Sequence, residues 1–382
     1  MNTLGIKQEN KNTAALPQQH EITAPHRLLD AAGQLIEPGY AKSLIAEYER
    51  SDIKASKLRI KEWDYYLIAC DDFALALTIA DNSYMGLDSI SLLDFRIPWE
   101  HTNSPMQLLT LGKKKLPPTS KLGDVSSSGK GYELSFENDG KSRTLSFRME
   151  KFADGKPISG TVTLETPDDE TMVIATPFAE KDTAFYYNQK INCMPAHGKV
   201  LFGDTVYEFP KGSSFGTLDW GRGVWTYKNT WYWGSASGMA DGVRFGWNIG
   251  YGFGDTSAAS ENMLFYDGKA HKLSQVKFNI PMKNRTYTTH GGCCGGTSGK
   301  TVDTADLIED YMSPWTFTSD DGRFEMDFVP IIDRASCTDL KLLCSDQHQV
   351  FGKFTGHAAL DDGKVIEVND FLGFAEKVFN KW

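Results

Sequence analysis

Short apolar-rich segments alternate with Asp-Gly pairs along most of this chain. An Asp-Gly pair tolerates the positive φ angles of a tight hairpin turn, so each pair between two apolar segments predicts two antiparallel strands that are joined locally. The six pairs are Asp139-Gly140, Asp154-Gly155, Asp241-Gly242, Asp267-Gly268, Asp321-Gly322 and Asp362-Gly363. We therefore expect six hairpins in a β protein.

The segments beside these turns alternate between apolar and polar residues. Leu145, Phe147 and Met149, which precede the second turn, are separated by polar residues. A period of two places the apolar side chains on one face of a strand. Residues 66–70 and 73–79, on either side of an Asp-Asp pair, predict a further strand pair.

Helical periodicity is convincing only from Tyr40 to Glu49. Antiparallel strands that are joined by short turns, without intervening helices, predict an all-β sandwich or an up-and-down barrel. The 382 residues exceed the roughly 250–300 residues at which one core stops growing, so two domains are expected. Because the pattern loosens before residue 216, we expect a disordered tail at 1–23, an N-terminal β domain at 24–205 and a C-terminal β domain at 206–382.

The charge of the chain excludes one class of partner. The formal net charge is -10 and no block of Lys and Arg stands out, which argues against a nucleic-acid partner and disfavours anionic membrane surfaces. No apolar run approaches the roughly 20 residues that span a bilayer, so no transmembrane segment is expected. Residues 1–23 lack the apolar core of a signal peptide, which predicts a soluble, cytoplasmic protein.

The cysteines do not predict a metal site. Cys293 and Cys294 lie between glycine pairs just after His290, but adjacent cysteines cannot easily point at one ion, and a flexible loop is the better interpretation. The sequence also lacks nucleotide-binding glycine motifs, the nucleophile elbow of serine hydrolases and the zinc-binding helix motif of metalloproteases. We therefore expect chemistry without a metal or cofactor, or binding alone.

Residues 215–262 contain the highest density of large aromatic rings in the chain. Five of the nine tryptophans fall there, together with an Asp, an Arg and several glycines. This composition is typical of a small-molecule cavity with few polar groups. The candidate ligand-binding residues are Trp63, Trp220, Trp225, Trp231, Trp233, Trp247 and Asn262.

Asp219 is the candidate general acid. A carboxyl group that packs against tryptophans is desolvated, which favours its protonated, proton-donating form. Alternatively, Asp219 caps a turn or pairs with Arg222. Arg222 could hold a substrate carboxylate or enolate-like oxygen, or stack on a tryptophan and brace the loop.

Two further residues complete the candidate catalytic set. Tyr251 could polarise a substrate oxygen or serve as an aromatic core residue. Glu261 could enter the cavity or satisfy backbone groups, and a pair formed by Asp219 and Glu261 would also suit glycoside hydrolysis if the two groups were ~5–9 Å apart.

Several motifs resemble a known family over nearly the whole chain after the tail. They are Arg27-Leu28-Leu29-Asp30, Glu37-Pro38-Gly39-Tyr40, Lys61-Glu62-Trp63-Asp64-Tyr65-Tyr66, Leu218-Asp219-Trp220-Gly221-Arg222-Gly223, Gly250-Tyr251-Gly252, Glu261-Asn262 and His348-Gln349-Val350-Phe351-Gly352. In this order they resemble the bacterial family of the domain of unknown function 2804, which is similar to the carotenoid 1,2-hydratase and AttH-like proteins. The resemblance implies two lipocalin-like antiparallel β-barrel domains packed together, with little helix and an apolar ligand site near their junction.

The related hydratases carry an Asp-His-Asn-Trp-Gly-like segment followed by a Trp-x-Trp pair. The pair matches Trp231 and Trp233, and the Asp aligns with Asp219, but the His-Asn is missing here. A histidine with a share in the acid role therefore has no counterpart at this position.

Three functions are compatible with these residues. The first is a cofactor-independent acid/base enzyme of the hydratase, isomerase or cyclase type, acting on a hydrophobic unsaturated small molecule in an aromatic cavity. The second is a non-catalytic binding protein for a lipid, an isoprenoid or an aromatic metabolite. The third is a glycan-active or glycan-binding module, which would need an open groove with rings that face solvent.

Overall fold

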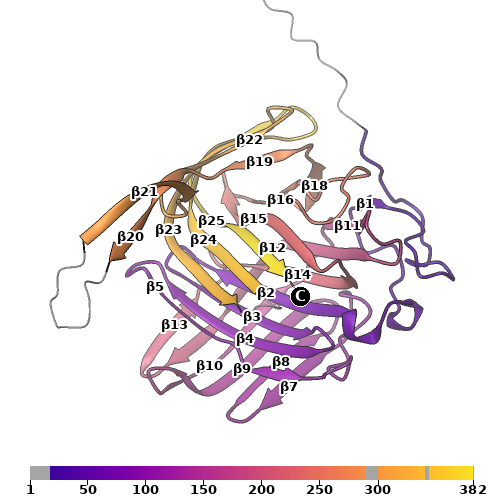
Figure 1. Ribbon diagram of the computed structural model, residues 1–382, viewed down its shortest axis with the longest axis horizontal. Coiled ribbons are helices and arrows are strands. Elements are labelled where there is room, and N and C mark those ends of the chain that lie inside the picture. The colour runs from indigo at the N-terminus through magenta and orange to yellow at the C-terminus, as the bar shows by residue number, and fades with distance from the viewer. Residues whose placement is uncertain (1–17, 290–299, 340–343, 382) are drawn as a thin grey trace, which may run out of the picture.

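The computed structural model describes residues 18–289, 300–339 and 344–381. Within these ranges the chain folds almost entirely into antiparallel strands, which form two large sheets and one separate hairpin (Figure 1). The helical content is two single turns of 3-10 helix, η1 (Arg50–Asp52) and η2 (Lys57–Arg59). The expected Cys293-Cys294 loop and residues 1–17 of the expected tail lie outside the described residues.

The first sheet contains fourteen strands and curls around the larger hydrophobic core. Its members are β1 (Gly39–Ala41), β2 (Lys61–Ala69), β3 (Phe73–Asp81), β4 (Met85–Asp94), β5 (Trp99–Asn103), β6 (Met106–Leu108), β7 (Val125–Gly129), β8 (Tyr132–Asn138), β9 (Ser142–Ala153), β10 (Lys156–Glu165), β11 (Met172–Pro177), β12 (Phe185–Phe202), β13 (Thr205–Phe209) and β14 (Phe215–Val224). The main order is β5-β4-β3-β2-β14-β12-β10-β9-β8-β7. The curl brings the two ends together, and the Asn103 side chain donates across the gap to the carbonyls of Lys151 and Phe152, each at 3.2 Å.

The second sheet contains nine strands in the order β18-β17-β16-β15-β25-β24-β23-β22-β19. Its members are β15 (Lys228–Ala240), β16 (Val243–Tyr251), β17 (Met263–Tyr266), β18 (Lys269–Lys272), β19 (Val276–Asn279), β22 (Trp315–Ser319), β23 (Phe324–Asp339), β24 (Cys344–Ala359) and β25 (Val365–Lys381). The separate hairpin pairs β20 (Met282–Thr289) with β21 (Lys300–Glu309) and projects from the edge of the molecule (Figure 1). In the order of the nine-stranded sheet, the last strand of the chain, β25, lies in the middle.

All six Asp-Gly pairs lie in hairpin turns between paired strands, as predicted. In three of them both residues adopt positive φ, as type I′ turns require: Asp154, Asp241 and Asp267 have φ of 51°, 50° and 49°. The predicted pairing of residues 66–70 with 73–79 is also confirmed, as β2 and β3.

The helix suggested for residues 40–49 is wrong. Tyr40 and Ala41 instead belong to β1, which pairs with Ile174 and Val173 of β11. This pairing satisfies backbone groups that a helix would have bonded internally, so the tertiary partner overrides a weak local periodicity.

The two sheets pack face to face, and the outer face of the first sheet meets the second. Tyr65 and Leu67 of β2 share a buried cluster with Trp233, Phe351 and Phe374 of the second sheet. We call the layer between the sheets the junction. The fold is thus all-β, with two antiparallel sheets packed together and little helix, as expected.

Sheet membership changes between β14 and β15. β13 begins at residue 205 and β14 follows it, and both belong to the first sheet. The division into domains at 205 and 206 stays a prediction. None of the described helices is long and apolar enough to cross a membrane.

Candidate functional site

Asp219 lies at the junction and is paired with a lysine. Alternation along β14 points Asp219 toward the second sheet, and its side chain is 11% exposed. Lys190 is its neighbour in the β12–β14 register, with Nζ 2.9 Å from Oδ2. Asn188 Nδ2 donates to Oδ1 at 2.6 Å. Both carboxylate oxygens of Asp219 are therefore occupied by donors.

Arg222 lies on the opposite face of β14, inside the first core. It is fully buried, and its Nη2 pairs with Asp64 Oδ1 at 3.0 Å. Its Nη1 donates to the carbonyl of Trp63 at 2.8 Å, and the guanidinium stacks 4.1 Å from the ring centroid of Trp220. The suggested pair between Asp219 and Arg222 is wrong, because residues three apart in a strand point to opposite faces. The stacking alternative for Arg222 is confirmed.

Gly221, between these two residues, makes room for a ring. It faces the junction beside Asp219, and a Cβ atom there would collide with the indole of Trp63. The glycine of the Asp-Trp-Gly segment thus lets Trp63 lie flat on the strand.

The second sheet presents a matching row of side chains to the first. Gln349, Glu376 and Trp233 are neighbours across β24, β25 and β15. Lys190 Nζ lies 3.7 Å from the ring centroid of Trp233, within cation–π range. Tyr65 of β2 is the neighbour of Asp219 in the register between β2 and β14. The distance from its hydroxyl oxygen to Gln349 Nε2 is 3.4 Å. Two cross-strand rows of polar and aromatic groups therefore face each other across the junction.

Glu376 is the residue in this row whose protonation is most perturbed. Burial raises its pKa to about 7, against the opposing effects of a hydrogen bond from Trp231 and the charges of Arg334 and Lys190. Trp231 Nε1 donates to Oε1 and Gln349 Nε2 donates to Oε2, each at 3.0 Å. Both the protonated and the ionised form of Glu376 are therefore populated near neutral pH.

Glu261 is a third carboxyl group near the same row. Burial raises its pKa, while Lys190 and a contact from Asn248 Nδ2 at 3.4 Å lower it. Asn248 also accepts from Trp233 Nε1 at 2.7 Å, which ties Glu261 to the row. The entry of Glu261 into a ligand cavity stays a prediction, and its side chain lies beside Asn248.

Aromatic rings form the adjoining part of the junction. Trp63 stacks on Tyr186 at 6.1 Å between centroids and meets Trp225 edge to face at 5.5 Å. Phe253 contacts Tyr186, Trp225 and Trp231 at 4.7, 5.3 and 5.2 Å. Trp63, Trp231, Glu261 and Glu376 are only half-buried although they face the opposite sheet. Water-accessible surface therefore remains beside the carboxyl groups.

A small cavity continues the junction along the strands. Its volume is about 20 Å³, enough for one water molecule. Its lining includes Thr217 and Ser235, which lie two residues along their strands from Asp219 and Trp233, and the hydroxyl of Ser237. The remaining lining residues are Leu67, Ala69, Phe215, Ala236, Phe351, Leu372 and Gly373.

The remaining predicted residues lie away from the junction. Trp220 is in the first core, and Trp247 is in the second, 5.2 Å from Phe354. Tyr251 stacks on Tyr232 at 4.4 Å, and burial raises its pKa to about 12.

Asn262 supports the backbone of the second sheet. It accepts from the Gly250 N–H at 2.7 Å and donates to the Ser274 carbonyl at 2.8 Å. The structure therefore brings together Asp219, Glu261, Trp63, Trp225, Trp231 and Trp233, and separates them from Arg222, Tyr251, Trp220, Trp247 and Asn262.

Four polar residues of the junction were missed by the sequence interpretation: Asn188, Lys190, Gln349 and Glu376. A signal existed for Glu376, because it interrupts an apolar face of its strand, whereas the faces that carry Asn188, Lys190 and Gln349 hold several polar residues. Glu376 shares its face of β25 with Phe374. The proximity of the four residues in space could not be predicted, because the register between distant strands does not follow from the local sequence pattern.

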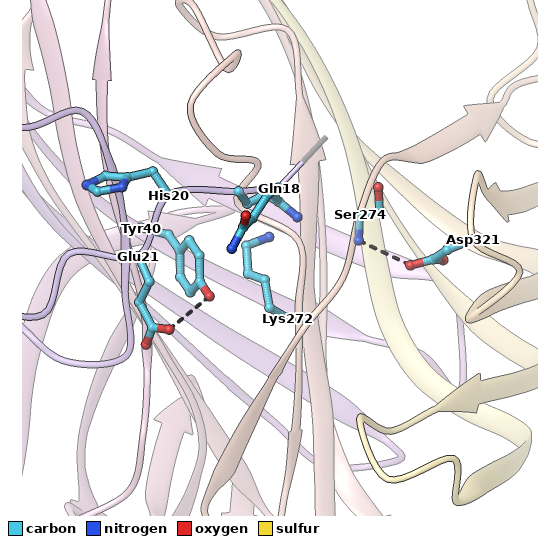
Figure 2. A pocket seen from close by; sticks show the side chains of 8 residues that line it. Gln18, His20, Glu21, Tyr40, Lys272, Ser274 and Asp321 are labelled. Carbon is cyan, nitrogen blue, oxygen red and sulfur yellow. Dashed lines mark hydrogen bonds between the residues drawn. The ribbon is translucent and has the colours of Figure 1, made fainter. Parts of the chain in front are cut away.

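A larger hollow lies at the surface, beside the first described residues (Figure 2). Its volume is about 740 Å³, and it is lined by Gln18, Gln19, His20, Glu21, Tyr40, Lys272, Ser274 and Asp321. Burial lowers the pKa of Lys272 to about 7, yet its ammonium group has three acceptors at 2.8 Å, Ser260 Oγ and the carbonyls of Asn262 and Leu273. The walls are polar, unlike the predicted aromatic cavity.

The fold and the junction define an all-β protein with a buried acid/base cluster between two sheets. The family model of the domain of unknown function DUF2804 matches residues 19–382, and the chain belongs to this family, as its motifs predicted. No curated protein matches the chain in sequence.

Two solved structures illustrate the structural comparisons. An AttH-type protein from Nitrosomonas europaea is 12% identical, with 88% of this chain and 97% of that chain covered and a TM-score of 0.49. Kievitone hydratase from Nectria haematococca is 10% identical, with 96% of this chain and 98% of that chain covered and a TM-score of 0.42.

Proposed function

We propose that this protein is a cofactor-independent acid/base enzyme of the hydratase, isomerase or cyclase type. Its substrate is a hydrophobic unsaturated small molecule held at the junction, and Glu376 is the group that transfers the proton. The observation that carries this proposal is the Glu376 carboxyl group, whose pKa burial raises to about 7 beside half-buried tryptophans. Buried groups with such perturbed protonation concentrate at functional sites.

Glu376 replaces Asp219 as the proposed proton donor. Both oxygens of Asp219 accept hydrogen bonds or an ion pair, from Asn188 and Lys190. The two groups differ in their partners, because the donors to Glu376 are the uncharged Trp231 and Gln349, whereas one oxygen of Asp219 forms an ion pair with Lys190. Asp219 is then a positioning residue that fixes Lys190 and adds negative charge opposite the substrate.

Hydration fits the surroundings of Glu376. Protonated Glu376 gives its proton to one carbon of the double bond, which leaves a positive charge on the other carbon. The faces of Trp63 and Trp231 and the Asp219 carboxylate stabilise this cationic carbon. A water oxygen then bonds to that carbon, and the proton released by this water returns to the Glu376 carboxylate. The water-sized cavity lined by Thr217 and Ser235 supplies a place for the attacking water.

The test compares wild type with Glu376→Gln. Each protein is incubated with lysate of the native host, and bound small molecules are identified by native mass spectrometry. We expect a compound to accumulate on Glu376→Gln and to be converted when wild type is added. Glu367→Gln is the matched control, because Glu367 lies on the same strand but is exposed.

Carriage of a lipid, an isoprenoid or an aromatic metabolite is the alternative outcome. A compound that both proteins hold and neither changes would contradict catalysis and establish a binding protein. The glycan function has less support, since the open groove of Figure 2 is lined by polar chains and its Tyr40 is buried.

A further inference from the structure

The segment that follows β5 has its polar residues inside and its apolar residues outside. Gln107, Thr110 and Lys114 point into the first sheet, as their hydrogen bonds show. Four apolar residues beside them in the sequence are exposed: Met106 at 66%, Leu108 at 85%, Leu109 at 55% and Leu111 at 42%. We call these four side chains the apolar ridge. Single exposed apolar side chains are ordinary, but four within six residues form an apolar patch of the kind that marks a site of interaction with a protein or a membrane.

Buried acids hold the segment in this orientation. Thr110 Oγ1 donates to Asp81 Oδ1 at 2.8 Å, and Lys114 Nζ contacts Asp88 Oδ1 at 2.6 Å. Both aspartates are fully buried. Gln107 Nε2 donates to the Tyr132 hydroxyl at 2.9 Å. The apolar ridge is therefore a built part of the sheet edge.

The backbone of the segment is strained as well. Leu109, Leu111 and Lys115 have φ of 54°, 50° and 54°, in the left-handed region that residues with a Cβ atom rarely adopt. For the two leucines this conformation and the exposure to water are both unfavourable. Stability does not explain such residues, and strain of this kind persists at functional sites.

The local charge is opposite to that of the whole chain. The net charge is -10, yet no acidic residue lies between Glu100 and Asp124. Lys113 and Lys115 are exposed directly after the apolar ridge. At physiological salt the screening length is about 8 Å, so an approaching surface responds to these lysines more than to distant acids.

We propose that the apolar ridge docks this protein on a lipid bilayer. Its methionine and leucines enter the interfacial region, and Lys113 and Lys115 contact anionic headgroups. A lipid surface suits the ridge better than a protein partner, because a few side chains cover only a fraction of the roughly 800 Å² per partner of a stable protein interface. The lysines give the bilayer its charge complementarity.

The docking segment is connected to the aromatic part of the junction. The Leu109 N–H donates to the Tyr84 carbonyl at 2.9 Å. Lys61 Nζ lies 4.7 Å from the Tyr84 ring and 5.1 Å from the Trp225 ring, and Trp225 packs on Trp63. Docking would bring this side of the junction toward the membrane, where apolar molecules are dissolved.

The test is vesicle flotation with phosphatidylcholine, with and without phosphatidylserine. The key variant is Leu109→Asn/Leu111→Asn, because Asn tolerates left-handed φ better than Leu. We expect thermal unfolding of this variant at the same or a higher temperature than wild type. We expect its partition onto vesicles to fall by about tenfold or more, since two inserted side chains are lost. Val206→Asn is the control, because Val206 is 58% exposed but lies on β13.

Lys113→Gln/Lys115→Gln separates the two contributions. It should lose the part of the binding that depends on phosphatidylserine and keep the rest. Wild type that binds neither vesicle, or Leu109→Asn/Leu111→Asn that binds as well as wild type, would overturn the proposal. Dimerisation in light scattering that only Leu109→Asn/Leu111→Asn abolishes would assign the ridge to a second copy of the chain and also overturn it.

Discussion

The two faces of β14 carry two different kinds of buried charge. On the inner face Arg222 pairs with Asp64, and Arg50 pairs with Glu62, so each of these carboxylates has its own arginine. On the outer face Asp219, Glu261 and Glu376 share Lys190, while Arg334 also acts on Glu376 and Lys272 also acts on Glu261.

The two faces differ in how their carboxyl groups are paired with cations and in how far water can reach these groups. Arg222 is fully buried and the Glu62 side chain is 3% exposed, whereas Glu261 and Glu376 keep accessible surface. A buried ion pair alone is therefore a poor sign of function. Carboxyl groups that share one lysine and that water can still reach are a better sign, because burial raises the pKa of Glu261 and of Glu376 there.

The largest effect is expected from breaking the inner pair. Arg222→Met leaves Asp64 buried without its cation, and we expect a loss of about 3–5 kcal/mol in the free energy of unfolding. Urea denaturation measures this loss. Arg148→Met is the control, because Arg148 pairs with Glu133 on the surface and such pairs contribute about 0–1 kcal/mol. A loss as small as that of the control would contradict the comparison.

The outer face should instead show a dependence on pH. The pKa of Glu376 rises from its ordinary 4.5 to about 7 on folding, so the folded state holds a proton that the unfolded state has released between these values. Wild type therefore loses stability as the pH rises through this window, on the order of 3 kcal/mol. Glu376→Gln cannot ionise and should lose less.

The measurement for this prediction is a series of urea melts from pH 4 to pH 8. Glu376→Gln should gain on wild type as the pH rises, and Glu367→Gln should run parallel to wild type. Parallel curves for all three proteins would show that Glu376 titrates normally.

Gly221→Ala tests the packing in the aromatic part of the junction. The new methyl group collides with the Trp63 indole, and overpacking of this kind costs about 1–3 kcal/mol. We also expect tryptophan fluorescence to shift to longer wavelength, as Trp63 moves away from Tyr186 and Trp225. Unchanged stability together with an unchanged spectrum would contradict the packing.

The last comparison removes single hydroxyl groups on the two sides. The Tyr48 hydroxyl donates to Glu62 at 2.8 Å on the inner face, and Tyr48→Phe should cost about 1.5–3 kcal/mol because the acceptor is charged and buried. The Tyr65 hydroxyl lies at the long distance of 3.4 Å from Gln349, so Tyr65→Phe should cost about 0.5 kcal/mol or less. The reverse order would undo the contrast between the two faces.

The hairpins could be predicted from the sequence, because Asp-Gly turns and alternation are local signals. Asp241-Gly242 and Asp267-Gly268, for instance, lie at the turns they predict. The membership of β14 in the first sheet could not be predicted, because its partners β2 and β12 are set by register between distant segments.

The candidate site was predicted in part for the same reason. Asp219 and the Trp231-x-Trp233 pair were found because they stand out in composition. Lys190 and Glu376 were not, because only the pairing of strands brings them beside Asp219 and Trp233. The alternative pair between Asp219 and Arg222 could have been excluded, because a period of two points residues three apart to opposite faces of a strand.

The central position of β25 has a consequence for the order of folding. Trp231 and Glu376 are separated by 145 residues along the chain, yet β15 and β25 are neighbours in the second sheet. The β15–β18 group and the β19, β22–β24 group can each begin from local hairpins, and among the described strands β25 is the one that pairs with both groups. Because such non-local pairing is slow, we expect refolding to be limited by this step. The proposed proton donor, Glu376, would then reach its native surroundings last, so that its raised pKa would report completion of the native state.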